Sequence, residues 1–364
     1  MSGSNKKLEA IRREIDALDA ELLAMMNRRA QLAKKVAEVK DGEGSSHYYR
    51  PEREAQVLRA LAAANNGPLS GAHVARIFQE IVSACRALQK SLAVAYLGPE
   101  GTFTESAAFK HFGHAIDAVP VEDIGSVFRR VESGGSDYGV VPIENSTEGV
   151  VGHTLDMFVS SGVSICGEVE LAVHHCLLGS AGDLEDIARI YSHQQSFGQC
   201  RRWLDANLPK VPRETVASNG EAARRASGEK GSAAIAGERA AADHGLRVLV
   251  RNIEDEPENT TRFVILGRQA VGATGSDKTS VLFSTKDRPG ALYELLRAFK
   301  ERDINMTRIE SRPSHRGKWS YVFYVDFEGH ADDANVTEAL AELEERAPFY
   351  KFLGSYPQSS AWSA

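Results

Sequence analysis

The chain has 364 residues, of which 42% are hydrophobic, 26% charged and 7% aromatic, with a formal net charge of -7. At roughly 100–200 residues per domain, this length predicts two or three domains. The acidic balance argues against a nucleic-acid partner, because nucleic-acid-binding domains usually carry a basic surface. No apolar run approaches the roughly 18–20 residues of a membrane span, and the charged N-terminus has no apolar signal core. With four cysteines and no CxxC spacing, we expect reduced thiols in a cytoplasmic protein.

Residues 1–92 are expected to form an all-helical domain. The stretch 5–91 is rich in Ala, Leu, Glu, Arg and Lys. Pro51 suits the first turn of a second helix, Asn66-Gly67-Pro68 ends that helix, and a third runs from about Ser70 to Ser91. The first helix has two apolar heptad positions, formed by Leu8, Ile15 and Leu22 and by Ile11, Leu18, Met25, Leu32 and Val39. At about 1.5 Å per residue it is too long for its neighbours to cover, which predicts a dimer.

A cation interrupts this apolar seam. Arg29 follows Leu22 in the same register, and a guanidinium there is costly unless it is paired or bound to an anion. Lys40 lies about 20° from Arg29 around the helix, so the two side chains can converge on one anion. Arg12 points about 100° away and is expected to serve a different pocket. The alternative is a solvated basic face on a coiled coil.

Residues 93–268 alternate short β-rich runs with helical stretches, which is typical of α/β architecture. Four polar stretches, at 98–103, 142–149, 192–200 and 259–263, lie at strand ends or in turns, where α/β proteins bind ligands. GPEGTF lacks the spacing of a nucleotide phosphate loop, and His174-His175-Cys176 has no second cluster, so we expect no metal and no cofactor. Each stretch taken alone also fits a turn or a helix cap.

The C-terminal region, 278–357, follows a small-residue linker at 268–276. Its pattern predicts the βαββαβ order of a ferredoxin-like α+β domain, with these elements: Thr279–Ser284, Gly290–Arg302, Ile304–Arg312, Trp319–Phe327, Asp333–Arg346 and Phe349–Tyr356. Pro289-Gly290 opens the first helix, and free backbone amides there can bind a carboxylate. The alternative is a plain helix N-terminus.

The helical region resembles the AroQ type of chorismate mutase. The resemblance covers about residues 5–91 and rests on LxxIRxEIDxLDxELLxMxxRRxxL, YYRPEREAQVL and RIFQEIVSACRALQ. It implies a catalytic set of Arg12, Arg29, Lys40, Arg53, Glu54 and Gln89, with Arg12 reaching into the pocket of a partner subunit. The arginines would bind the carboxylates of chorismate, Lys40 and Gln89 its ether oxygen, and Glu54 its ring hydroxyl. Arg50 and Cys85 replace an acidic residue and a serine common in the family, and are weaker binding candidates.

The middle region resembles prephenate dehydratase, through GPEGTF, PIENSTEG, YSHQQSFGQC and NTTRF in this order, over about Val94 to Gly267. The family implies two α/β lobes like those of type II periplasmic solute-binding proteins, with prephenate in the cleft. Thr261 is the family's essential residue and is expected near the leaving hydroxyl, with Glu144 as an alternative proton donor. The expected binding residues are Asn145, Ser146, Thr147, Ser192, Gln199 and Arg262.

The tail resembles the ACT domain of phenylalanine-regulated enzymes, through RPGALYELLRAF and INMTRIESRP. It implies an L-phenylalanine site at a dimer interface, formed by Gly290, Ala291, Leu292, Asn305, Glu310, Ser311, Arg312 and Pro313. The three resemblances agree on one pathway, phenylalanine biosynthesis, and predict a bifunctional, feedback-inhibited homodimer or higher homo-oligomer. Two alternatives are a dehydratase whose helical domain only dimerises or regulates, and a non-enzymatic ligand sensor. The TTRF and ENSTEG stretches argue against the sensor, because a pure binder needs no such set of hydroxyls.

Overall fold

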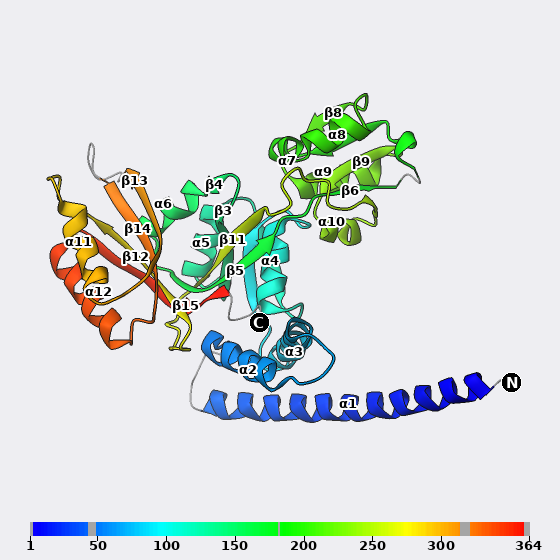
Figure 1. Cartoon of the computed structure of the whole chain (residues 1–364), viewed down its shortest axis with the longest axis horizontal. Coiled ribbons are helices and arrows are strands. Elements are labelled where there is room, and N and C mark those ends of the chain that lie inside the picture. The colour runs from blue at the N-terminus through cyan, green and yellow to red at the C-terminus, as the bar shows by residue number, and fades with distance from the viewer. Residues whose placement is uncertain (1–2, 43–48, 181–182, 314–320, 360–364) are drawn as a thin grey trace.

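A computed structural model describes residues 3–42, 49–180, 183–313 and 321–359. Figure 1 shows a long helix below two shorter helices, a central sheet, a second lobe at the upper right and a smaller sheet domain at the left. The fold class expected from the sequence is confirmed in each of these parts.

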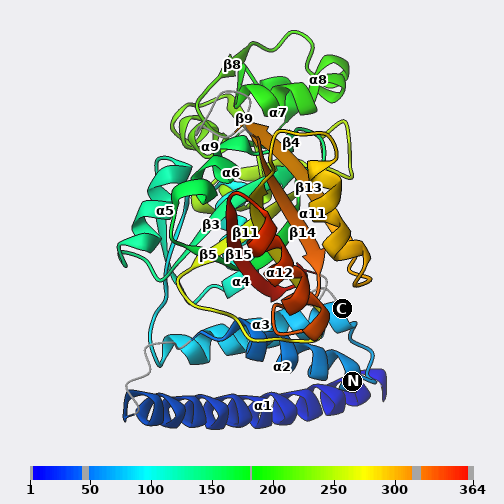
Figure 2. The ribbon, with the colours of Figure 1, turned by 90° about the vertical axis from the view of Figure 1, so that its left-hand side faces the viewer.

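The helical part comprises α1 (Gly3–Gly42), α2 (Pro51–Ala64) and α3 (Gly71–Ala87). Pro51 occupies the first turn of α2, and the Ser70 side chain caps α3 by accepting from the backbone N–H of His73. In Figure 1, α2 and α3 lie over one end of α1, and its N-terminal half extends beyond them, while Figure 2 shows both helices above α1. The apolar side chains Leu8, Ile11, Ile15, Leu18 and Leu22 there are 45–58% exposed. This surface is an unpartnered apolar stripe within the single chain.

The first α/β lobe is built on a mixed sheet in the order β2-β1-β3-β11-β5, with β4 beside β3. Its elements are β1 (Ala93–Leu97), α4 (Phe103–Phe112), β2 (Asp117–Val121), α5 (Ile124–Glu132), β3 (Tyr138–Asn145), β4 (Gly149–Val150), α6 (Gly152–Ser160), β5 (Ser164–Ala172) and β11 (Thr260–Gly267). Strands β1, β2 and β3 are parallel, whereas β11 runs antiparallel between β3 and β5. Because β11 is antiparallel to β3, the first residues of β11 lie beside the last residues of β3.

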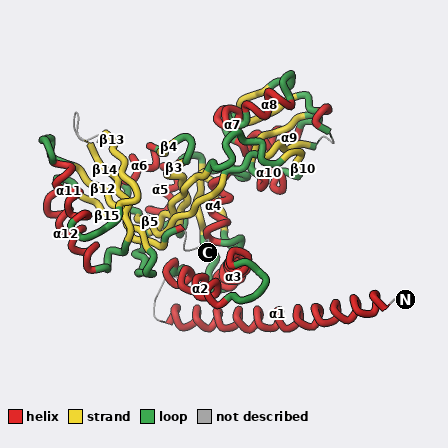
Figure 3. The backbone as a smooth tube through the Cα atoms, viewed as in Figure 1, coloured by secondary structure: helices red, strands yellow, loops and turns green. Residues whose placement is uncertain are grey.

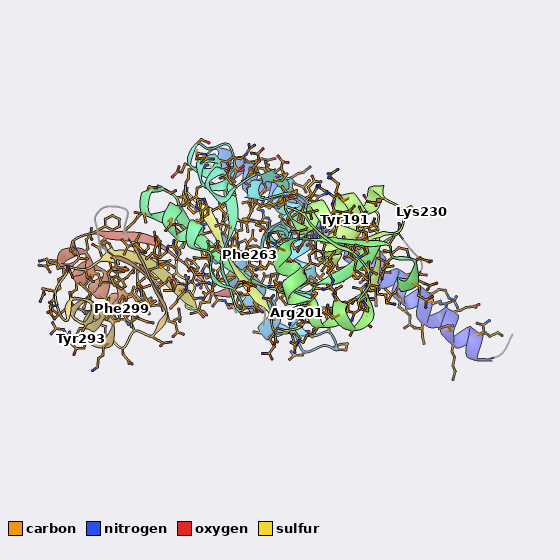
Figure 4. The ribbon with its side chains drawn as sticks, turned by 90° about the horizontal axis from the view of Figure 1, so that it is seen from above. Tyr191, Arg201, Lys230, Phe263, Tyr293 and Phe299 are labelled. Atoms are coloured by element: carbon orange, nitrogen blue, oxygen red, sulfur yellow. The ribbon has the colours of Figure 1, made fainter. Side chains whose placement is uncertain are left out.

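The second lobe lies between β5 and β11 in the chain and carries a sheet in the order β10-β6-β9-β7-β8. Its elements are β6 (Cys176–Gly179), a short 3-10 helix (Leu184–Asp186), β7 (Arg189–Ser192), α7 (Gln194–Gln199), α8 (Arg201–Asn207), β8 (Arg213–Thr215), α9 (Asn219–Gly228), β9 (Ser232–Ala236), α10 (Glu238–Asp243) and β10 (Arg247–Val250). Figure 4, seen from above, places Phe263 of β11 between Tyr191 in this lobe and Phe299 of the C-terminal domain. The first lobe therefore occupies the centre of the molecule.

The C-terminal domain is a four-stranded antiparallel sheet in the order β13-β14-β12-β15, with two helices on one face (Figure 3). Its elements are β12 (Asp277–Ser284), α11 (Ala291–Lys300), β13 (Met306–Pro313), β14 (Tyr321–Glu328), α12 (Ala334–Arg346) and β15 (Tyr350–Pro357). The expected start of β14 at Trp319 lies outside the described residues. The other face of the sheet packs on the first lobe, where Tyr324 and Leu353 share an apolar cluster with Leu155 and Phe158.

The stretch 268–276 is less free than its small residues suggest. Val271 is buried, and Arg268 donates to the carbonyls of Val131 and Ser136. The side-chain amide of Gln269 donates to the carbonyl of Tyr49, 3.1 Å away. The segment is fixed because it passes between the helical part, the first lobe and the C-terminal domain, and donates to groups of two of them.

Candidate active sites and effector site

A cavity of about 340 Å³ lies between the three helices of the N-terminal part. Its lining includes all of the predicted residues of this region except Arg12, namely Arg29, Lys40, Arg50, Arg53, Glu54, Cys85 and Gln89. The apolar part of the wall comes from Leu32, Ala33, Val36, Val57 and Val82. Helical periodicity brings these side chains to one place, because positions three, four and seven apart share a face.

The charges of this cavity act on one another. Burial lowers the pKa of Lys40, and Arg50 lowers it further, while Glu52 opposes them. Burial raises the pKa of Glu54, against the opposing influence of Arg86 and Arg29. An excess of cationic side chains around a single buried carboxylate suits a small dianion that also carries a hydroxyl.

Two of the predicted residues differ from the rest. Arg12 is exposed on the projecting half of α1, about 25 Å from Arg29 at about 1.5 Å per residue, and lies outside the cavity. Arg50 lies at the rim, with its side chain 64% exposed and its Nε 2.8 Å from Oε1 of Glu52. Among the charged lining residues, sequence reasoning missed Arg86, which is buried and contacts Glu54.

A second cavity, of about 430 Å³, lies between the two α/β lobes. The first lobe contributes Thr102, Phe103 and Thr104 at the start of α4, Pro142 and Asn145 of β3, and Thr261 and Phe263 of β11. The second lobe contributes His193, Gln195, Ser196, Gln199 and Asn219, and His175 comes from the segment that joins the lobes. An outer hollow of about 650 Å³ shares His193, Gln195, Gln199 and Asn259 with it and adds Thr147 and Arg202.

Thr261 and Asn145 meet at the floor of this cleft because β11 pairs with β3 in that register. Nδ2 of Asn145 donates to Oγ1 of Thr261 and to Oδ1 of Asn259, at 2.7 Å in both cases. Oδ1 of Asn145 accepts from the backbone N–H groups of Thr147 and Glu148, at 3.0 Å. Because its oxygen already accepts a hydrogen bond, the Thr261 hydroxyl can turn its own proton toward a ligand.

The remaining predicted polar residues lie at different depths in and around the cleft. Ser192 is buried, and its single hydroxyl proton has two acceptors within reach, Oδ1 of Asn219 at 3.2 Å and the Ile235 carbonyl at 3.3 Å. It therefore supports the wall without lining the cavity. Ser146 accepts from the backbone N–H of Thr260 at 2.9 Å and fixes the loop that carries Asn145. Gln199 bridges the two lobes, with its Nε2 3.3 Å from a carboxylate oxygen of Glu148.

Glu144 and Arg262 are placed differently from their predicted roles. They pair with each other across β3 and β11, one position from Asn145 and Thr261, so their side chains point to the opposite face of the sheet. Oε2 of Glu144 lies 3.1 Å from Nε of Arg308, and Arg262 is bound to Glu168 and Asp326 at 2.7 and 2.6 Å. Both side chains therefore face the C-terminal domain, and neither lines the cleft.

His175 was weighed in the sequence only as part of a metal cluster, yet it lines the cleft. Gln199 must turn its Nε2 to the Glu148 carboxylate, so its Oε1 accepts from Nε2 of His175, 2.7 Å away. The pKa of His175 is lowered, chiefly by burial, which favours the neutral ring with Nε2 protonated. Its Nδ1 is buried and, among the described residues, has no hydrogen-bond partner.

The predicted effector residues occupy two places in the C-terminal domain. Gly290 precedes α11 with a φ of 79°, a left-handed conformation that favours glycine, and Ala291 and Leu292 follow it. Asn305 lies just before β13, an edge strand that carries Glu310, Ser311, Arg312 and Pro313. Arg312 forms a two-pronged ion pair with Asp156 of α6, at 2.8 and 2.9 Å, so this position also contacts the first lobe.

Across the described ranges, no helix combines the length and apolar character that a bilayer crossing needs. In the same ranges, no three or more His, Cys, Asp or Glu side chains are grouped as a metal site would require. All four cysteines are buried as free thiols, and burial raises the pKa of Cys166 to about 12.

Comparisons with known proteins agree with this division of the chain. Residues 11–90 match the family model of chorismate mutase type II, residues 94–271 that of prephenate dehydratase and residues 279–345 that of the ACT domain. Bifunctional chorismate mutase/prephenate dehydratases from Pseudomonas aeruginosa and Neisseria gonorrhoeae are 51% and 48% identical, over 97% and 95% of this chain and 98% and 96% of their own.

A solved prephenate dehydratase from Arthrobacter aurescens, in complex with L-Phe, is 37% identical, with a TM-score of 0.68. The match covers 74% of this chain and 92% of that one. Because the curated relatives match along nearly their whole length, all three parts of the chain are accounted for together. The chain therefore belongs to the bifunctional chorismate mutase/prephenate dehydratase family.

Proposed function

We propose that the cavity between α1, α2 and α3 is the chorismate mutase site. Arg29 and Arg53 bind the two carboxylates of chorismate, and Lys40 and Gln89 donate to the ether oxygen as negative charge grows there. Glu54 accepts from the ring hydroxyl. The rearrangement is pericyclic and needs no nucleophile, so the rate gain comes from holding the dianion in its reactive, folded conformer.

We further propose that a second copy of the chain completes this site. The exposed apolar stripe of α1 supplies the interface, because apolar side chains at heptad spacing pack against an equivalent helix. Arg12, which lies outside the cavity of its own chain, then reaches into that of the partner subunit. The assembly is a homodimer or a higher homo-oligomer, and we place it in the cytoplasm.

The cleft between the α/β lobes is the proposed prephenate dehydratase site, and the observation that carries it is the pairing of Thr261 with Asn145. The Thr261 hydroxyl hydrogen-bonds to the leaving hydroxyl of prephenate. The ring then loses its carboxylate as CO2 and that hydroxyl, which takes up one proton and leaves as water, and aromatisation drives the reaction. His175 and Gln199 line the same cleft and are proposed to orient the substrate.

The substrate carboxylates meet backbone amides there. Among the described residues, the 430 Å³ cavity has no Lys or Arg in its lining, but Phe103 at the start of α4 and Asn219 at the start of α9 line it. Helix N-termini carry free N–H groups and partial positive charge, which stabilise anions. Arg202 in the outer hollow is already paired with Glu256 and Asp255, at 2.7 and 3.7 Å, so it adds no available cation at the entrance.

The assay that tests both sites starts from chorismate and follows prephenate and phenylpyruvate separately. Thr261→Ala is expected to accumulate prephenate and to abolish phenylpyruvate formation, because it removes the hydroxyl, together with one methyl group, from the floor of the cleft. Loss of both activities in a folded variant would contradict two independent sites. A dehydratase whose helical part merely dimerises would convert prephenate but leave chorismate untouched, and this outcome is the one to expect if Arg50 and Cys85 disable the mutase.

We also propose that L-phenylalanine, the end product, binds the C-terminal domain and inhibits the dehydratase. The proposed ligands are the residues that begin α11 and those of β13. The domain limits that we propose for the whole chain are 1–92, 93–268 and 278–357. The L-Phe complex of the Arthrobacter aurescens relative supports the effector. Strand β13 also forms ion pairs with the first lobe, Arg308 with Glu144 and Arg312 with Asp156, which gives it a direct contact with the strand that carries Asn145.

A further inference from the structure

Arg86 of α3 is a buried arginine that the chorismate mutase resemblance does not assign. It is only 4% exposed, yet it lines the mutase cavity. Its Nη1 lies 2.6 Å from Oε1 of Glu54, and its Nη2 donates to the backbone carbonyl of Phe112 at 2.6 Å. The guanidinium thus joins a side chain of the mutase cavity to the last residue of α4, which belongs to the dehydratase lobe.

Aromatic rings hold the guanidinium in place. The carbon of the guanidinium lies 5.0 Å from the ring centre of Tyr49 and 6.0 Å from that of Phe112. Tyr49 is itself fixed, since its hydroxyl lies 2.7 Å from Nε2 of His111. A cation that lies over ring faces and is shielded from water gains more from this contact than an exposed one, so the position of Arg86 is well defined.

The end of α4 needs the donors that α3 provides. The last carbonyls of a helix have no partner within it, and a cation near them interacts favourably with the helix dipole. The Gln79 side chain donates to the carbonyl of His111 at 2.9 Å, and Arg86 to that of Phe112. The end of α4 and helix α3 approach each other closely at Gly113, since any other residue there would place its Cβ 2.5 Å from the Cβ of Ser83. The other end of α4 lines the dehydratase cleft.

We propose that Arg86 is a positioning residue of the chorismate mutase reaction, which holds Glu54 in the orientation and charge state that accept the ring hydroxyl of the substrate. Because its second hydrogen bond goes to Phe112, the mutase cavity takes its final shape only when packed on the dehydratase lobe. This inference rests on the mutase site proposed above and assigns to α4 the role of the common support of both sites.

Several charges act on Glu54, and they decide the expected pH dependence. Arg86 of α3 and Arg29 of α1 lower its pKa, while burial and Glu52 of α2 raise it. Tyr49 lies in the same cluster, and burial keeps it protonated by raising its pKa. Without Arg86 the carboxyl loses its nearest cation, so protonation of Glu54 extends to higher pH.

The test uses the full chain and compares Arg86→Leu and Arg86→Lys with a matched control, Arg59→Leu. Arg59 is also partly buried in the helical part and donates to a carbonyl of another segment, that of Thr274 at 3.1 Å, but it lies outside the cavity. We expect Arg86→Leu to lower kcat/KM of the mutase about 100-fold at pH 7, the cost of misplacing a catalytic group by about 1 Å. The acidic limb of its pH profile should move up by roughly 1–3 units. Arg86→Lys keeps a charge and recovers part of the loss, and Arg59→Leu changes neither quantity.

Dehydratase activity on added prephenate reports folding in every variant. An unshifted acidic limb in Arg86→Leu would overturn the inference, because a merely structural arginine lowers activity equally at every pH. Additive effects of Arg86→Leu and Glu54→Gln would overturn it as well, since a residue that acts through Glu54 has nothing left to act on in the double variant. If Arg29→Ala leaves the mutase unaffected, the proposed site itself is wrong. If Arg29 is required and Arg86 is not, only the present inference fails.

Discussion

Replacing Arg262 with methionine tests the placement of this arginine at the contact with the C-terminal domain. The substitution keeps most of the apolar stem but removes the guanidinium that lies 2.7 Å from Glu168 and 2.6 Å from Asp326. Those carboxylates are 1% and 6% exposed. Lys278 still reaches Glu168 at 2.8 Å, whereas Asp326, within the part of the chain that the structure describes, keeps only the hydroxyl of Ser280 at 2.6 Å and the more distant Arg308. The variant therefore leaves a buried carboxylate poorly compensated.

The size of the effect follows from that burial. Removing one partner of a buried ion pair typically costs about 3–5 kcal/mol, because the other charge stays desolvated. For a domain of 150–250 residues this corresponds to a fall in Tm of roughly 6–20 °C. Dehydratase activity below the new Tm should change little, because Arg262 lies on the face of β11 away from the cleft.

The loss of stability in Arg262→Met is expected to depend on pH in one direction. Burial alone would raise the pKa of Asp326 and Glu168, but Arg262 and the other donors around them lower both. A carboxyl whose pKa is lower in the folded state stabilises the fold above its unfolded pKa of about 4, and that stability is lost as the pH falls through the folded value. In Arg262→Met the carboxyls are easier to protonate, and protonation relieves the buried charge. The deficit should therefore be largest at neutral pH and shrink on acidification.

The assay is thermal unfolding of wild type and variant from pH 4 to pH 8. Arg224→Met is the matched control, because Arg224 pairs with Glu221 at 2.7 Å but is 65% exposed, and exposed pairs contribute little. The double variant Arg262→Met/Asp326→Asn should recover part of the loss. A deficit that stays constant with pH, or one no larger than that of the control, would refute the buried-charge reasoning.

Two further predictions concern the mutase and the regulation. Gln89→Glu should inactivate the mutase at neutral pH and recover on acidification, because a carboxylate repels the charge growing on the ether oxygen whereas a carboxylic acid donates to it; a flat pH profile would count against this role. Arg308→Met should leave dehydratase activity without effector nearly intact but weaken its inhibition by L-phenylalanine, because it removes the 3.1 Å contact between β13 and Glu144. Unchanged inhibition would exclude this contact from the regulatory path.

Local periodicity was enough to predict most of the fold. The heptad pattern of 8–40, the Pro51 helix start and the alternation of strands and helices after residue 278 are all properties of neighbouring residues. The third helix ends at Ala87, a few residues before its predicted end. In the helical part the same periodicity also placed Arg29 and Lys40 on one face, and both line the mutase cavity. The other lining residues, Arg50, Arg53, Glu54, Cys85 and Gln89, were predicted from the chorismate mutase resemblance and not from spacing.

The arrangement of the dehydratase site was harder to predict, because it depends on pairing between distant strands. Nothing local indicates that β11 returns from the second lobe to lie beside β3. Once Asn145 and Thr261 are placed in the cleft, the alternation of strand side chains would have sent Glu144 and Arg262 to the other face. This alternation can be read from the sequence alone, so the positions of Glu144 and Arg262 could have been predicted. Arg86 carried no comparable signal, because its role depends on a backbone carbonyl of Phe112 in another domain.

The central sheet explains how effector and substrate sites can be coupled over a short distance. Strands β3 and β11 present Asn145 and Thr261 to the cleft, and their immediate neighbours Glu144 and Arg262 to the C-terminal domain. A paired strand cannot move one face without the other, since both sets of side chains share a backbone. An effector needs only to favour one position of the C-terminal sheet, with a different affinity for each state, to shift the Thr261 hydroxyl. The ion pairs of Arg262 and Arg308 are therefore the contacts that would carry such a difference directly to these two strands.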